Sequence, residues 1–142
     1  MNSPEVFKGK CRKITEGKVE GEAVVTKDHV NFYLVDPERG TIIEEGHDLE
    51  GKKIADKILV FPGDKGSSVV QLDGLYQLAM KNNKPKALVA GELSTVLVSN
   101  AIIMEIPLVC DVDEKFYEII KNGDHIAIDT EEGTISIRAG AC

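Results

Sequence analysis

The sequence has few of the features that mark disulfide-rich or metal-binding chains. Its 142 residues include three cysteines, Cys11, Cys110 and Cys142, which are far apart and form no C-x-x-C pair. An odd, scattered set argues against a disulfide framework, and iron-sulfur clusters usually have at least two ligands closely spaced in the sequence. Cys110 follows the apolar residues 107–109, so we expect it to be a small hydrophobe in a buried strand.

Long apolar runs and an excess of positive charge are also absent. The first ten residues, MNSPEVFKGK, predict no secretory signal, and no stretch approaches the roughly 20 apolar residues of a membrane span. We therefore expect a cytoplasmic protein with no membrane contact. The 17 basic and 24 acidic residues give a net charge of −7, which disfavours binding to nucleic acid. One basic run is predicted to form the solvent face of an alternating strand: Lys8, Lys10, Arg12 and Lys13.

The length and composition favour one globular unit. A chain of 142 residues has room for one domain of ordinary size. Its 42% hydrophobic and 29% charged residues are typical of a folded chain rather than a disordered one. We predict a single domain over residues 1–142.

The N-terminal half, from residue 5 to about 61, is predicted to be all-β. Segments 22–26, 30–35 and 57–61 are rich in β-branched and aromatic residues. Turn signals separate the strands at residues 16–17, 36–40 and 45–48.

From residue 67 onward the hydrophobic period lengthens to three and four residues. This spacing predicts a helix to residue 82 or 83 with one buried face, formed by Val69, Leu72, Leu75, Leu78 and Ala79. Gly74 weakens that helix slightly. Strands are then expected at 87–90 and 108–111, and helices at 94–104 and 114–121.

Such a β-α-β-α-β segment needs parallel strands covered by helices. Residues 125–129 and 134–138 alternate with period two and predict a terminal hairpin. The expected fold class is α/β, with a β-rich layer joined to a small parallel α/β layer.

The best candidate for chemistry is the segment FPGDKGSS at residues 61–68, where a buried strand ends and a helix begins. Ligands collect at this edge in α/β structures. Gly63 and Gly66 let the backbone bend and approach a ligand, the first helical N–H groups are donors for an anion, and Lys65 adds positive charge. The spacing matches neither the Walker A motif nor the dinucleotide fingerprint.

A purely structural role is also open for the two serines. Ser68 and Gln71 fit an S-x-x-Q capping box, so one serine is expected to cap the helix. The other serine is then left to face the crevice.

Other polar candidates favour structural roles. The three histidines, His29, His47 and His125, have no partner at metal-ligand spacing, so we expect solvent contact or local hydrogen bonds. Acidic residues after the strand at 108–111 are expected to be ordinary helix-start residues, namely Asp111, Asp113 and Glu114.

At the glycine-serine turn the sequence resembles the small, swivel-type subunits of the aconitase X group. The resemblance covers nearly the whole chain and depends on several segments in order: 19–23, 35–42, His47, Gly51, 58–68, 85–88 and 106–109. It implies a β/β/α swivelling domain that closes over a larger subunit carrying a [4Fe-4S] cluster. In archaeal members the resemblance implies dehydration of (R)-5-phosphomevalonate to trans-anhydromevalonate 5-phosphate.

The resemblance assigns the family's serine base to Ser67 and makes Lys65, Gly66 and Ser68 candidates for substrate binding. Dehydration next to a carboxylate needs a base for a carbon-bound proton and a Lewis acid for hydroxide. Serine is a poor base while neutral, so its alkoxide needs helix N–H groups and a cation. True aconitases are similar in this turn but have arginine after G-S-S, where this sequence has Val69. The cation must then be Lys65 or come from the large subunit.

Three alternatives remain open. A related enzyme of the same group dehydrates cis-3-hydroxyproline, and the swivel domain alone hardly separates the two substrates. A phosphohistidine carrier domain has a similar shape, but its histidine would be expected near residues 91–95, where Thr95 stands. In a non-catalytic binding module, Ser67 would only cap a helix.

Overall fold

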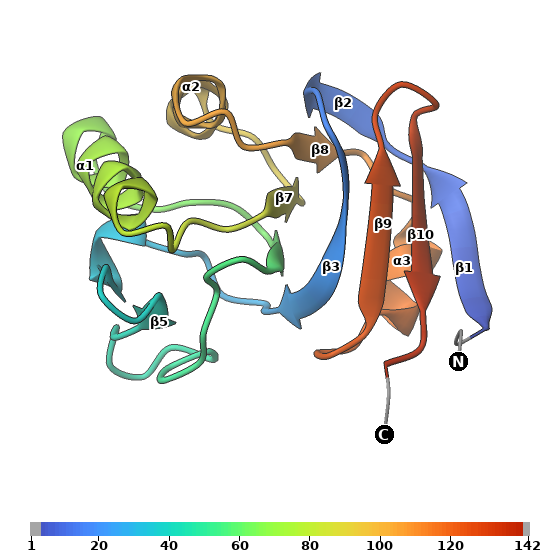
Figure 1. Ribbon diagram of the computed structural model, residues 1–142, viewed down its shortest axis with the longest axis horizontal. Helices are drawn as coiled ribbons and strands as arrows, with labels where there is room; N and C mark the ends of the chain where they lie inside the picture. Colours follow the sequence, from blue (N-terminus) through green and yellow to red (C-terminus); the bar gives the residue numbers. More distant parts are fainter. Residues whose placement is uncertain (1–3, 141–142) are drawn as a thin grey trace.

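The computed structural model describes residues 4–140, so Cys142 lies outside the described residues. In chain order the elements are β1 (Glu5–Lys10), β2 (Arg12–Thr15), β3 (Lys18–Val25), the 3-10 helix η1 (Phe32–Leu34), β4 (Val35–Asp36), β5 (Thr41–Ile42), β6 (Ile58–Phe61), α1 (Ser68–Met80), β7 (Ala87–Ala90), α2 (Thr95–Ile103), β8 (Leu108–Cys110), α3 (Glu114–Ile119), β9 (His125–Asp129) and β10 (Thr134–Arg138). Figure 1 shows their arrangement.

Eight of these strands form one sheet in the order β1-β10-β9-β3-β6-β7-β8-β2, while β4 and β5 pair separately. Strands β1 and β2 lie at opposite edges of this sheet, although only Cys11 separates them. The Cα atoms of Lys10 and Arg12 are two steps apart, at most about 7.6 Å, whereas the outer strands of a flat sheet of eight strands would be about 34 Å apart. The sheet must therefore curl until its two edges meet, as Figure 1 shows at the junction of β1 and β2.

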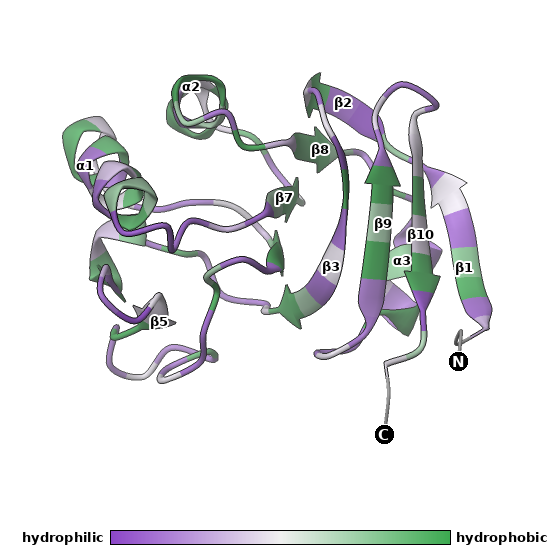
Figure 2. Ribbon diagram, in the orientation of Figure 1, coloured by the Kyte–Doolittle hydropathy of each residue, from purple (hydrophilic) through white to green (hydrophobic). Residues whose placement is uncertain are grey.

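The parallel part of the sheet carries the helices. Strands β3, β6, β7 and β8 run parallel, and β6-α1-β7-α2-β8 is the predicted alternating unit. Figure 2 shows β7 and β8 hydrophobic throughout, whereas β1 alternates. This difference is expected because strands between helices are buried on both faces. The terminal hairpin β9–β10 is antiparallel, as predicted.

Two hydrophobic clusters fill the two faces of the sheet. One contains Phe32, Phe61 and Leu75 and lies under η1, α1 and α2. The other contains Phe116 of α3 and the inward residues of β9 and β10. Figure 1 shows α1 and α2 side by side and α3 on the opposite side of the sheet, near β1.

Two sequence-based predictions are wrong in this region. Residues 30–35 do not form a strand: Val30 makes an isolated bridge and 32–34 form η1. The Asn31 side chain accepts a hydrogen bond from the Tyr33 N–H at 3.0 Å, and this local bond competes with strand pairing. Val69 is also not on the buried face of α1, because it is 75% exposed.

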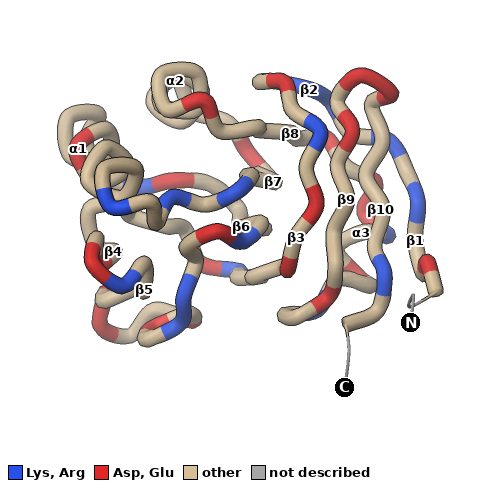
Figure 3. Tube along the Cα trace, viewed as in Figure 1, with Lys and Arg blue, Asp and Glu red and all other residues tan. Residues whose placement is uncertain are grey.

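The basic run at the N-terminus is exposed, as predicted, but it divides between two strands. Lys8 and Lys10 lie on β1, while Arg12 and Lys13 lie on β2 at the other edge. Figure 3 shows basic and acidic segments interleaved along the chain.

Candidate active site

The parallel strands bring four connecting segments to one edge of the sheet. Because β3, β6, β7 and β8 run parallel, the residues that follow each strand lie at the same edge. These residues are Thr26–His29, Pro62–Ser67, Gly91–Ser94 and Asp111–Asp113. The glycine-serine turn after β6 therefore has polar neighbours that are distant in sequence.

Backbone hydrogen bonds fix the first part of this turn. The Val30 N–H donates to the Gly63 carbonyl at 3.0 Å, and the Lys65 N–H donates to the Val30 carbonyl at 3.1 Å. Gly66 has a φ of +107°, and a Cβ at this position would lie 2.5 Å from Nε2 of Gln71. Only glycine fits both the backbone angle and the space.

Ser67 is exposed and is the N-cap of α1. Its Oγ accepts a hydrogen bond from the Val70 N–H at 3.4 Å, which is long for such a bond. The predicted Ser68–Gln71 capping box is wrong, because the N-cap is Ser67, one residue earlier. Gln71 is instead fully buried, where its Oε1 accepts from the Phe32 N–H and its Nε2 donates to Asn31. Ser67 thus combines a weak structural bond with an open hydroxyl.

Lys65 does not stand free in solvent. Its Nζ lies 2.6 Å from Oε2 of Glu44, in the segment after β5. No local pattern in the sequence links these two residues, and Glu44 was not a sequence-based candidate. The pair places an ammonium and a carboxylate beside the turn.

Ser68 is exposed at the first position of α1 and lines a shallow groove between α1 and α2. This groove has a volume of about 310 Å³, and its lining also includes Val69, Leu72, Val96 and Ile103. Ser68 therefore faces the same exposed end of the helix as Ser67, on its α2 side.

The turn after β7 is tied to the turn after β6. Ser94, the N-cap of α2, donates from its Oγ to Oδ1 of Asp64 at 2.8 Å. Glu92 lies 2.5 Å from Nε2 of His29, which precedes Val30. The N-termini of α1 and α2 thus open at one edge, where their unpaired N–H groups favour an anion.

The remaining candidates have structural roles, and Asp111 is the one that differs from its predicted role. His47 is buried, accepts from the Leu49 N–H at Nδ1, and has Nε2 at 3.0 Å from the His29 carbonyl oxygen. His125 lies 3.8 Å from Glu20. Asp113 is the N-cap of α3 and Glu114 its first residue, as predicted. The prediction for Asp111 is wrong, because this residue lies before the helix start and pairs with Arg12 of β2.

The described residues do not fit an iron-sulfur cluster. Within residues 4–140 no group of three or more His, Cys, Asp or Glu side chains could hold a metal ion. Cys110 is 2% exposed in β8, as predicted, and burial followed by the charge of Asp111 raises its pKa. Burial also raises the pKa of Cys11, with a smaller contribution from Cys110. Raised pKa values favour the thiol over the thiolate that binds metals.

A family model for the aconitase X swivel domain matches residues 8–137. The chain belongs to the aconitase X swivel domain family. The phosphomevalonate dehydratase small subunit of Archaeoglobus fulgidus is 41% identical over 128 residues, which cover 89% of this chain and 96% of that protein. The protein of the same name from Thermococcus kodakarensis is 40% identical over 132 residues, covering 92% and 96%.

Solved structures agree with this membership in the aconitase X swivel domain family. The crystal structure of Thermococcus kodakaraensis aconitase X in its holo-form has a TM-score of 0.83 at 40% identity and covers 92% of this chain and 98% of that one. A solution NMR structure of a UPF0107 protein has a TM-score of 0.80 at 39% identity, with the same coverage. The predicted swivel fold is confirmed. No helix within the described residues is long and apolar enough to cross a membrane.

Proposed function

We propose that this chain is the small subunit of a phosphomevalonate dehydratase, a hydro-lyase that is active only with its large subunit. The substrate is (R)-5-phosphomevalonate and the product is trans-anhydromevalonate 5-phosphate. The observation that carries the proposal is an exposed serine at the mouth of α1, in a chain 41% identical to a phosphomevalonate dehydratase small subunit over 96% of that protein.

Ser67 is the catalytic base in this proposal. Its Oγ, as an alkoxide, takes a proton from the substrate carbon next to the carboxylate. The electrons of that C–H bond form the new double bond, and hydroxide leaves from the neighbouring carbon. The long 3.4 Å bond to the Val70 N–H leaves the oxygen free to approach substrate while a helix N–H still stabilises its charge.

The residues next to Ser67 hold the substrate and the developing charge. Gly66 keeps the backbone close to the ligand because no side chain fits there. Lys65 supplies the positive charge that aconitases take from an arginine, since Val69 stands at that position. Ser68 contributes a hydroxyl on the α2 side of the same helix end.

The [4Fe-4S] cluster and most of the substrate contacts belong to the large subunit in this proposal. An iron with an open coordination position is a Lewis acid for hydroxide. This assignment agrees with the described residues, which offer no metal-binding group. We also propose that the two-subunit enzyme works in the cytoplasm.

Replacement of Ser67 tests the proposal. The chain is produced anaerobically with an aconitase X-type large subunit, and dehydration of (R)-5-phosphomevalonate and of cis-3-hydroxyproline is measured. Ser67→Gly should lower kcat by about 10²- to 10⁴-fold, the usual contribution of a general base. Glycine is a tolerable N-cap, so the helix should lose only a few tenths of a kcal/mol.

Asp113→Ala is the control, because it removes the cap of α3 on the other face of the sheet and should leave kcat within about twofold. Full activity of Ser67→Gly in an intact complex would refute the serine base. Turnover of cis-3-hydroxyproline alone would reassign the substrate.

A further inference from the structure

Lys65 is held both by its backbone and by the end of its side chain. Its Nζ lies 2.6 Å from Oε2 of Glu44, which is 21 residues earlier in the sequence. Its backbone N–H donates to the Val30 carbonyl at 3.1 Å. The Glu44 side chain is 20% exposed and the Lys65 side chain 44%, so the carboxylate is the more enclosed partner. The position of the ammonium is therefore set by Glu44.

The other oxygen of the Glu44 carboxylate, Oε1, is buried and has no hydrogen-bond partner within residues 4–140. A buried charged oxygen without a donor reduces stability, because it has lost its water without replacement. Groups retained at such a cost are common where geometry serves chemistry. The placement of Glu44 is thus not explained by folding alone.

A lysine that stabilises an alkoxide must be fixed before the reaction. A free lysine stem samples many rotamers, whereas preorganised charges need no rearrangement as the transition state forms. One ammonium N–H is used by Glu44, which leaves two for other oxygens. The backbone of Lys65 lies two residues before Ser67 in the same turn, so its ammonium is carried on a segment next to the N-terminus of α1.

We propose that Glu44 is a positioning residue that holds Lys65 beside Ser67 while the base carries its negative charge. This inference rests on the proposed function, since it needs Ser67 to act as an alkoxide. Glu44 does not touch the substrate, and its effect on the rate passes through Lys65.

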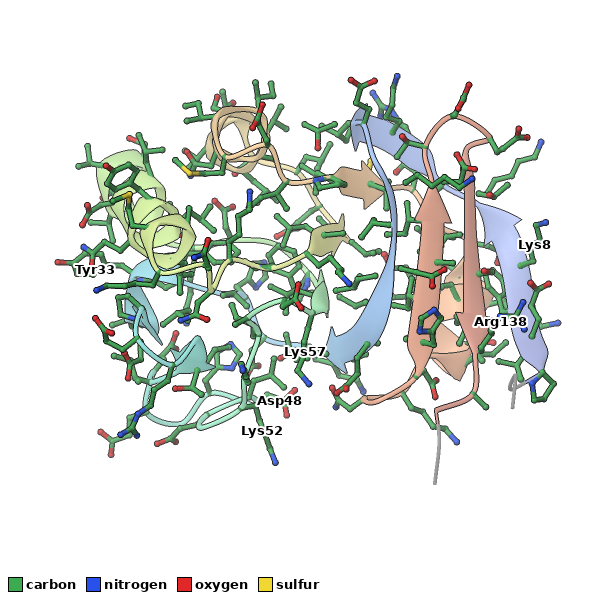
Figure 4. All side chains as sticks on the ribbon, in the orientation of Figure 1. Lys8, Tyr33, Asp48, Lys52, Lys57 and Arg138 are labelled. Atoms are coloured by element: carbon green, nitrogen blue, oxygen red, sulfur yellow. The ribbon has the colours of Figure 1, made fainter. Side chains whose placement is uncertain are left out.

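The chain provides a matched ion pair elsewhere. Nζ of Lys57, just before β6, is also 2.6 Å from Oε2 of Glu22 in β3. Figure 4 shows Lys57 near Asp48 and Lys52, and these three residues line a separate cavity. A general effect of losing a lysine–glutamate pair should therefore also appear in Glu22→Gln.

The test uses the anaerobic complex with the large subunit and (R)-5-phosphomevalonate. Glu44→Gln should lower kcat by about tenfold or more, with KM changed by less than about threefold, because a transition-state interaction is weakened. Glu22→Gln should leave kcat within about twofold. With deuterium at the carbon that loses the proton, the isotope effect on kcat should rise in Glu44→Gln, which a structural role would not cause.

A double-mutant cycle shows whether Glu44 acts through Lys65. Lys65→Met alone should lower kcat at least as much as Glu44→Gln, and the combined variant should be no slower than Lys65→Met. Thermal unfolding of the full-length Glu44→Gln chain should occur within a few degrees of the unmodified chain, which excludes misfolding as the cause.

Two results would overturn the inference while the proposed function stands. One is full kcat in Glu44→Gln when Ser67→Gly is inactive, and the other is additive losses in the cycle. A complex in which the unmodified chain supports no dehydration would overturn the proposed function, and this inference with it.

Discussion

At the scale of single residues, Gly74 shows how packing reverses a local preference. A glycine inside a helix lowers its stability relative to alanine, which is why the sequence predicts a slightly weaker α1. In the structure, a Cβ at Gly74 would lie 2.5 Å from the carbonyl carbon and oxygen of Phe32 and 2.6 Å from the Tyr33 nitrogen. These contacts are with backbone, which cannot move aside cheaply. Gly74 therefore lets η1 approach α1.

We expect Gly74→Ala to lower the free energy of unfolding by about 2 kcal/mol or more, because overpacking against η1 outweighs the gain of about 1 kcal/mol in helix propensity. Urea unfolding followed by circular dichroism measures this change. Gly91→Ala is the control, since a Cβ there has its nearest contact at 3.4 Å, and it should have a much smaller effect. A stabilised Gly74→Ala variant would contradict the close approach.

At the scale of elements, the Gln71 side chain joins α1 to η1. It is fully buried and makes two bonds, accepting from the Phe32 N–H at 3.0 Å and donating to Asn31 Oδ1 at 2.7 Å. Asn31 in turn accepts from the Tyr33 N–H. These hydrogen bonds fix the first turn of α1, and with it Ser67, relative to the segment around Asn31. The same segment holds the Lys65 backbone through the Val30 carbonyl.

Gln71→Leu should lower the free energy of unfolding by about 2 to 3 kcal/mol, because the buried Phe32 N–H and the Asn31 oxygen lose a partner. Gln77→Leu on the same helix is the matched control: the Gln77 side chain is exposed and donates to the Asp73 side chain on the same helix, so its loss should be below about 0.5 kcal/mol. Equal losses in the two variants would show that the buried network is not what holds η1.

At the scale of the whole molecule, one curled sheet connects both hydrophobic clusters. Strands β3 and β6 to β8 have one face in each cluster, so neither face can lose its packing without exposing the other. Cys11 joins the two edge strands along the chain, and its N–H donates to the Gly133 carbonyl, between β9 and β10, at 3.0 Å. On this basis we propose that residues 1–142 fold as a single domain.

A single domain should unfold in one cooperative transition. Far-ultraviolet circular dichroism reports the whole sheet, while Tyr33 in η1 and Tyr117 in α3 are fluorescent probes on opposite faces of the sheet. Single-tyrosine variants at these two positions should give urea midpoints that coincide with each other and with the dichroism. Midpoints separated by more than the fitting error would indicate two units that unfold independently.

Much of the fold and part of the site could be predicted from the sequence. The parallel unit β6-α1-β7-α2-β8 and the β9–β10 hairpin have strong periodic patterns of hydrophobic residues. The glycine-serine turn is predictable because its glycines, Gly63 and Gly66, are visible in the sequence. The register of the cap could not be predicted, because Ser67 and Ser68 both fit an N-cap. Gln71 decides between them by turning into the core, toward residues 31 and 32, which are 40 and 39 positions away.

The sequence by itself determined the alternation of elements, the exposed basic run and the position of the glycine-serine turn, since each depends on neighbours along the chain. Only the tertiary structure decided that the edge strands β1 and β2 meet. It also decided that the η1 backbone packs directly on Gly74 and that Lys65 pairs with Glu44. These features depend on contacts between residues far apart in the chain, and no local pattern of side chains encodes which distant segments will meet.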